Sequence, residues 1–199
     1  MDIEAYRSIV AARVRERAPL RMEEDLIAAY LDILQFRPVR KKQYLVQPGF
    51  PNLDQIYVVE GAFRAFFIDS EGKEQTIQFA VEDWYISDTH SYLTGEPATL
   101  FVEALEDGVV ALLPKEAFEA LCDAHPKWQK ATRIVIQRGF AYAQKRLVAN
   151  LQKSAEERYR DFVRAYPQIE MRVPRHALAS YLNMSQEYLS KVRKKLLQK

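Results

Sequence analysis

Cysteine is almost absent from the sequence: Cys122 is the only one among 199 residues. One thiol cannot form a disulfide within the chain, and it cannot supply the thiolates of an iron–sulfur cluster or a cysteine-rich zinc site. Cys122 has apolar neighbours in a predicted helix, so we interpret it as a small core residue. The three histidines lie in separate segments without a carboxylate cluster. We therefore expect no metal site and no cofactor, with His90 as the only alternative ligand.

Long apolar runs and catalytic motifs are also missing. No stretch of 18 apolar residues and no signal peptide is visible, so we expect a soluble, cytoplasmic protein without a membrane partner. The sequence contains no nucleophile elbow, no phosphate-binding loop and no paired acid–base site. We therefore expect that the protein is not an enzyme.

Charge is unevenly distributed along the chain. Residues 153–199 contain 11 Lys and Arg against 5 Asp and Glu, a net charge of +6. Residues 1–152 contain the other 18 Lys and Arg against 22 Asp and Glu, a net charge of −4. A basic end on an acidic body is typical of a module that binds a polyphosphate such as nucleic acid.

The spacing of apolar residues divides the N-terminal part of the chain into two regions. Residues 2–36 have the spacing of helices, and Arg37-Pro38 is expected to end them, because a residue before proline avoids the helical conformation. Between residues 45 and 113 the spacing changes to two, in six or more short segments separated by turn residues. Short strands with turn signals about every 8–12 residues predict a β-sandwich or barrel.

A long helix is predicted over residues 127–153. It has too many apolar positions for one buried face, and at 1.5 Å per residue it is about 40 Å long. We expect a second subunit to cover it, with Phe140, Leu147 and Leu151 at the homodimer interface. The alternative is a helix sandwiched between two domains of one chain.

The C-terminal segment has the pattern of a helix-turn-helix. Ser154 and Glu157 form a capping box that begins one helix, and an apolar stripe predicts a short helix over 175–182. Asn183 tolerates the left-handed conformation of a tight turn, and Ser185 is a natural N-cap for a basic helix over 185–199. Such a second helix enters the major groove of DNA. The alternative is a helical hairpin with a solvated charged face.

The order of these parts resembles the cAMP receptor protein/FNR family of bacterial transcription regulators. The matching segments are RKKQYLVQPG, YVVEGAFRAFFIDSEGKEQTIQFA and SYLNMSQEYLSKVRKKL, with Asn183 where the family usually has glycine. The resemblance implies an α+β fold in three parts. These are N-terminal helices with a cyclic-nucleotide-binding-like β-roll (a double-stranded β-helix) in residues 1–126, a long dimerisation helix in 127–153, and a helix-turn-helix DNA-binding domain in 154–199.

The cyclic-nucleotide cassette departs from the family pattern. Relatives that bind cAMP carry a segment resembling F-G-E-L and then an Arg-Ser pair, which supply a carboxylate for the ribose and a guanidinium for the phosphate. The matching residues here are 83–88 and Ala98-Thr99, and no Lys or Arg lies between Lys73 and Lys115. We therefore expect that the cyclic-nucleotide site is lost and that the protein does not depend on cAMP.

Two interpretations of the residues around this cassette stay open. In the first they line a pocket for an unknown effector; in the second, which we favour, the aromatic side chains fill the space that cAMP occupies in relatives. The residues concerned are Trp84, Tyr85, Tyr92, Ala98 and Thr99.

The last predicted helix supplies the candidate DNA contacts. Gln186, Glu187 and Lys191 match the base-reading residues of the family motif, and such side chains pair with adenine, cytosine and guanine respectively. Three residues are expected to hold backbone phosphates. Arg193 and Lys194 do so with their side chains, and Ser185 does so as the N-cap that directs the following backbone amides at a phosphate.

These observations predict a DNA-binding transcription regulator, a homodimer that reads a palindromic site in double-stranded DNA. One alternative is a small-molecule sensor that controls DNA binding from the β-roll. Another is a module whose helix-turn-helix binds protein. RNA polymerase is kept as an open candidate partner, and the effector is unknown.

Overall fold

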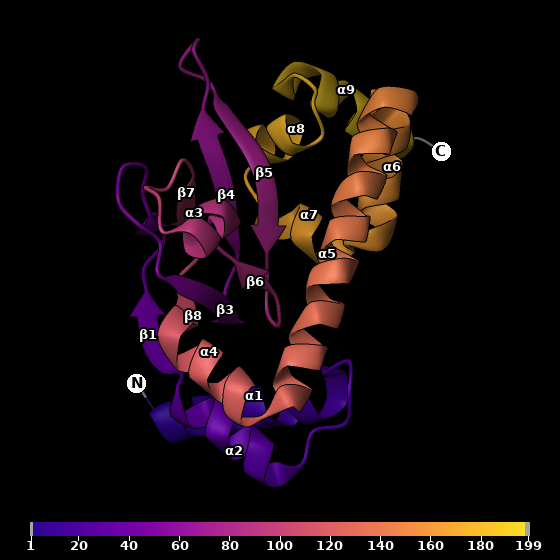
Figure 1. Cartoon of the computed structure of the whole chain (residues 1–199). Coiled ribbons are helices and arrows are strands. Elements are labelled where there is room, and N and C mark those ends of the chain that lie inside the picture. Colours follow the sequence, from indigo (N-terminus) through magenta and orange to yellow (C-terminus); the bar gives the residue numbers. More distant parts are fainter. Residues whose placement is uncertain (1, 198–199) are drawn as a thin grey trace.

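The computed structural model describes residues 2–197 (Figure 1). Its helices are α1 (Ile3–Arg17), α2 (Glu24–Asp32), α3 (Thr89–Thr94), α4 (Lys115–Ala124), α5 (Pro126–Gln152), α6 (Ala155–Ala165), α7 (Pro167–Arg172), α8 (Arg175–Tyr181) and α9 (Gln186–Leu197). Its strands are β1 (Gln35–Val39), β2 (Tyr44–Val46), β3 (Asp54–Glu60), β4 (Phe63–Ile68), β5 (Glu74–Ala80), β6 (Tyr85–Ile86), β7 (Phe101–Ala104) and β8 (Gly108–Pro114).

Two antiparallel four-stranded sheets form the β-roll that the sequence predicts. Their strand orders are β1-β8-β3-β6 and β2-β7-β4-β5. The space between the sheets is filled by apolar side chains with no exposed surface, among them Val58, Phe63, Val102 and Val110. Because successive side chains of a strand point to opposite faces, this shared interior explains the period of two in the sequence.

The sequence prediction is wrong at the start of the β-roll. Helix α2 ends at Asp32 and β1 begins at Gln35, inside the expected helical region. Pro38 has no N–H to donate, and β1 is an edge strand, where a proline is tolerated. The apolar pattern also fails to predict β6, α3 and α7, because elements of two to six residues hold fewer than two helical turns or strand repeats.

The N-terminal helices cover the outer face of the first sheet, at the lower end of the view in Figure 1. They also bury the start of α5. The Trp128 ring stacks on Tyr30 with 4.6 Å between centroids, and the indole N–H donates to the Leu26 carbonyl at 3.1 Å. The first turns of the long helix therefore find their apolar partners within the chain.

The C-terminal helices share a hydrophobic core with the β-roll. Phe79 of β5 packs on Phe162 of α6 and on Tyr181 of α8, with ring centroids 6.5 and 5.0 Å apart. At the edge of this core, Arg172 forms ion pairs with Glu82 and Glu106 of the β-roll, both at 2.7 Å. The helix-turn-helix is consequently fixed on the sheet by both packing and charge.

Candidate functional site

The helix-turn-helix is built as the sequence predicts. Asn183 has φ of 52°, the left-handed conformation of a tight turn, and its N–H donates to the Ser180 carbonyl at 2.9 Å. The Ser185 hydroxyl accepts from the Tyr188 N–H at 3.1 Å, so Ser185 caps α9. Residues 198 and 199, part of the predicted helix 185–199, lie outside the described residues.

Helix α9 has one buried and one exposed face. Leu189 and Val192 are 1% and 4% exposed and pack in the core beneath the helix. Gln186, Glu187 and Lys191 are exposed on the other side, as is Lys194. This separation leaves a polar face of α9 open to a partner, and it contains four of the six predicted DNA contacts.

Arg193 also makes a contact within the chain that the sequence did not predict. Its side chain is 31% exposed and pairs with the carboxylate of Glu170 on α7, whose side chain is 10% exposed, at 2.9 Å. Successive side chains of a helix are rotated by about 100° around its axis. Arg193 follows the buried Val192, and this rotation directs it toward the body of the domain rather than toward solvent. Arg193 therefore ties α9 to α7, and its contact with a DNA phosphate stays a prediction.

Asp88 occupies the centre of the β-roll cassette. Its carboxylate is buried, with the residue 2% exposed, and it caps α3 by accepting from the Ser91 N–H at 3.1 Å. Its Oδ2 accepts from the N–H groups of Thr99 and Leu100 at 2.8 and 3.0 Å, and from the Thr99 hydroxyl at 3.3 Å. Burial alone would raise the pKa of Asp88, but these hydrogen bonds outweigh it and lower the pKa. The cassette thus holds a permanent anion of its own.

The surrounding loops close around this carboxylate. The Asn52 side chain donates to the Ser87 hydroxyl at 2.7 Å and to the Asp88 carbonyl at 3.2 Å. The Asn52 N–H donates to the Ser91 hydroxyl at 2.9 Å. Since Asn52 belongs to the β2–β3 loop, the two loops are joined by buried hydrogen bonds.

The five predicted pocket residues do not converge on one site. Trp84 packs edge-on against Tyr166 of the C-terminal helices, with centroids 5.4 Å apart. Tyr85 packs instead against the core of the N-terminal helices, and its hydroxyl lies 2.7 Å from that of Tyr30 on α2. Tyr92 is buried near Lys115. Ala98 belongs to the interior between the sheets, and Trp84 also packs against that interior. Thr99 is exposed, although its N–H and hydroxyl both donate hydrogen bonds to the Asp88 carboxylate.

Other charged residues of the cassette are paired elsewhere. Asp83 contacts Arg13 at 2.7 Å and also pairs with Arg17, both on α1. Glu96 lies 3.0 Å from His90. Within residues 2–197 no three His, Cys, Asp or Glu side chains gather as metal ligands, and no described helix is long and apolar enough to cross a membrane.

An exposed apolar stripe follows the second half of α5. Ile136, Phe140, Leu147 and Leu151 are between 61% and 80% exposed. Their spacing of four, seven and four residues places them along one side of the helix. The three predicted interface residues are thus on one exposed face, in contrast to Trp128 and Ala131 at the start of the helix.

Comparison with known proteins identifies these parts. The cyclic nucleotide-binding domain family matches residues 36–125. The transcriptional activator Anr of Pseudomonas protegens is 24% identical over 181 residues, covering 85% of this chain and 73% of the relative. Together these matches support a regulator of the Crp/Fnr family.

Solved structures agree with this family's fold over most of the chain. FixK2 from Bradyrhizobium japonicum has a TM-score of 0.74 at 18% identity, covering 83% of this chain and 85% of its own. A Crp/Fnr-family regulator from Eubacterium rectale has a TM-score of 0.67 at 15% identity, and the match covers 88% of this chain and 84% of that regulator. The chain accordingly has the fold of these regulators, with a β-roll, a long helix and C-terminal helices.

Proposed function

We propose that this Crp/Fnr regulator is a homodimer that reads palindromic DNA with α9 and works without a cyclic nucleotide. The observation that carries the proposal is the exposed polar face of α9, whose opposite face is buried in the core. A helix held rigidly by one face and open on the other suits the width of the major groove.

The order of side chains along α9 assigns their contacts. Gln186 and Glu187 are in the first turn, which lies nearest the bases in a helix-turn-helix, and Lys191 follows one turn later. The Glu187 carboxylate accepts hydrogen bonds from the Glu187 N–H and from the Ser185 hydroxyl. These bonds lower the pKa of Glu187, so the carboxylate remains an acceptor at neutral pH. Glu187 therefore suits the amino group of cytosine, while Lys191 suits guanine. Lys194 holds the flanking phosphate backbone.

The exposed stripe of α5 supports the dimer. Four large apolar side chains in water are unfavourable by about 25 cal/mol per Å² of surface, and a second copy of the same stripe covers them. The two recognition helices then lie about 34 Å apart, and the half-site centres are about 10 base pairs apart.

Asp88 supports independence from cyclic nucleotides. The amides of Thr99 and Leu100 already bind its carboxylate, at the position where a phosphate needs donors. A nucleotide would have to displace a buried anion whose charge repels its own. The described cassette from residue 82 to 100 supplies no Lys or Arg to compensate.

Selection of bound fragments from random duplex DNA tests this function, followed by affinity measurements with and without cAMP. Lys191→Ala should cost about 1–3 kcal/mol at the preferred site and relax one base pair, because a base contact is lost. Lys194→Ala should weaken all sequences and flatten the salt dependence.

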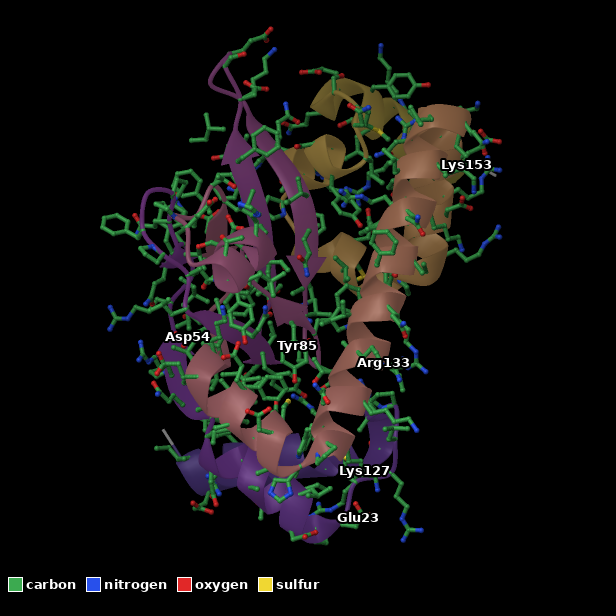
Figure 2. The ribbon with its side chains drawn as sticks, viewed as in Figure 1. Glu23, Asp54, Tyr85, Lys127, Arg133 and Lys153 are labelled. Atoms are coloured by element: carbon green, nitrogen blue, oxygen red, sulfur yellow. The ribbon has the colours of Figure 1, made fainter. Side chains whose placement is uncertain are left out.

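Lys127→Ala is the matched control for these measurements. Lys127 pairs with Glu23 at the end of α5 that lies far from Lys153 and the C-terminal helices (Figure 2). The Lys127→Ala variant should therefore leave the DNA affinity and its salt dependence unchanged. Unchanged DNA affinity in both α9 variants, or a cAMP requirement, would contradict the proposal.

A further inference from the structure

A cleft of about 570 Å³ separates the second half of α5 from the helix-turn-helix unit. Its walls come from α5, α6 and α8. The volume falls within the range of about 300–1,000 Å³ that small-molecule sites occupy. The cleft is distinct from the β-roll cassette and from the exposed face of α9.

The floor of the cleft is apolar, with hydroxyl groups at one end. Ala149, Phe162 and Ala165 contribute apolar surface, and the Tyr142 hydroxyl lies 3.1 Å from that of Tyr181. Burial and the neighbouring Tyr181 hydroxyl raise the pKa of Tyr142, so this group keeps its proton and can donate a hydrogen bond.

The rim of the cleft is cationic. Five Lys and Arg side chains line it against a single carboxylate, that of Asp161, which already pairs with Lys153. Lys145 and Arg164 are exposed there, and among residues 2–197 neither belongs to an ion pair. An excess of positive charge beside an apolar floor complements an anion with an apolar body.

The cleft faces away from the proposed dimer interface. Lys145 and Ala149 lie two residues on either side of Leu147, and two residues correspond to about 200° around a helix. A dimer formed through Leu147 therefore leaves the cleft open.

We infer that this cleft binds a small organic acid, with an apolar body on the Ala149–Phe162 floor and its carboxylate at Lys145 and Arg164. The largely apolar lining fits such a molecule better than a phosphate backbone. An occupant contacts the long helix and the helix-turn-helix unit together, so it sets the angle between them. That regulatory consequence rests on the proposed function, whereas the binding step does not.

The test uses octanoate as the anionic probe and octyltrimethylammonium as a cation with the same chain, titrated by calorimetry without DNA. Octanoate should bind the wild-type protein, and the cation should bind at least about tenfold more weakly, because the rim repels it. The double variant Lys145→Glu, Arg164→Glu should weaken octanoate binding by about tenfold or more.

Arg138→Glu is the matched control. Arg138 lies seven residues before Lys145, on the same side of α5 two turns away, and it does not line the cleft. This variant should bind octanoate like the wild type. Absent octanoate binding at millimolar concentration, equal binding of the cation, or unchanged affinity in the double variant would each overturn the inference. Because DNA is left out, these outcomes are separate from failure of the proposed DNA-binding function.

Discussion

Replacing Asp88 by alanine should destabilise the β-roll and at the same time create an anion site. The substitution removes the N-cap of α3, which costs about 1 kcal/mol. It also removes the acceptor of the Thr99 and Leu100 N–H groups, and charge-assisted hydrogen bonds contribute about 1.5–3 kcal/mol each. Thr99 is exposed, so water replaces part of the lost bonding. We expect a net loss of about 3–4 kcal/mol in the free energy of unfolding.

Inorganic phosphate should restore part of this stability in the variant. The vacated cradle retains the N–H donors of Ser91, Thr99 and Leu100 and the Thr99 hydroxyl, which are suitable partners for an oxyanion. At ten times its Kd, a ligand that binds only the folded state adds RT ln 11, about 1.4 kcal/mol.

Urea unfolding measures both effects, in phosphate and in chloride of equal ionic strength. Asp88→Asn is the matched variant, because its amide oxygen keeps one acceptor without the charge, and it should lose about half as much stability. Equal phosphate stabilisation of wild type and Asp88→Ala, or a wild-type unfolding midpoint in the alanine variant, would refute the interpretation of Asp88 as a built-in anion.

Three further changes test other parts of the structure. Leu147→Glu places a charge in the exposed stripe of α5 and should yield monomers; a dimer by light scattering would locate the interface elsewhere. Burial raises the pKa of Glu82, but the hydrogen bonds from Arg172 and from backbone N–H groups, that of Gly61 among them, outweigh it and lower the pKa to about 2. The folded pKa is thus below the ordinary 4.5, so this contact stabilises the protein above about pH 4.5 and is lost as pH falls toward 2. Unfolding free energies across this window should depend less on pH in Glu82→Gln, and identical slopes would be contrary evidence. Arg64→Met leaves the buried carboxylate of Glu103 without its partner at 2.6 Å and should cost about 3–5 kcal/mol, with partial recovery in the double variant Arg64→Met, Glu103→Gln. If Arg64→Met were as stable in urea as the wild type, the buried Glu103 carboxylate would not depend on Arg64.

Local signals in the sequence were sufficient where a few adjacent residues determine the conformation. Asn183 and Ser185 fix the turn and the start of α9 through hydrogen bonds to residues three positions away, and these were predictable. The capping box of Ser154 and Glu157 is similarly local and is confirmed. The period of two revealed the strands because both sheets bury one face in a common interior.

Contacts between distant segments were not predictable in the same way. The missing arginine at Ala98 was visible in the sequence, but the sequence did not reveal that Asp88 bonds the amides 11 and 12 residues later. Arg193 carried the same charge as Lys194, and only the position of Glu170 on α7 distinguishes their roles. Pairing of this kind depends on how helices pack, which the spacing along one helix does not specify.

The built-in anion also limits where regulation can enter the molecule. A ligand shifts a conformational equilibrium only by the difference in its affinity for the two states, and only when its concentration can change. The Asp88 carboxylate is covalently part of the cassette, so its occupancy does not follow any concentration. Meanwhile Arg172 and the aromatic core hold the helix-turn-helix on the β-roll from one side. The cleft beside α5 borders this core through Phe162 and Tyr181, so an occupant would contact the same unit next to its fixed support. Control of α9 through this cleft is exerted from the long helix rather than from the cassette.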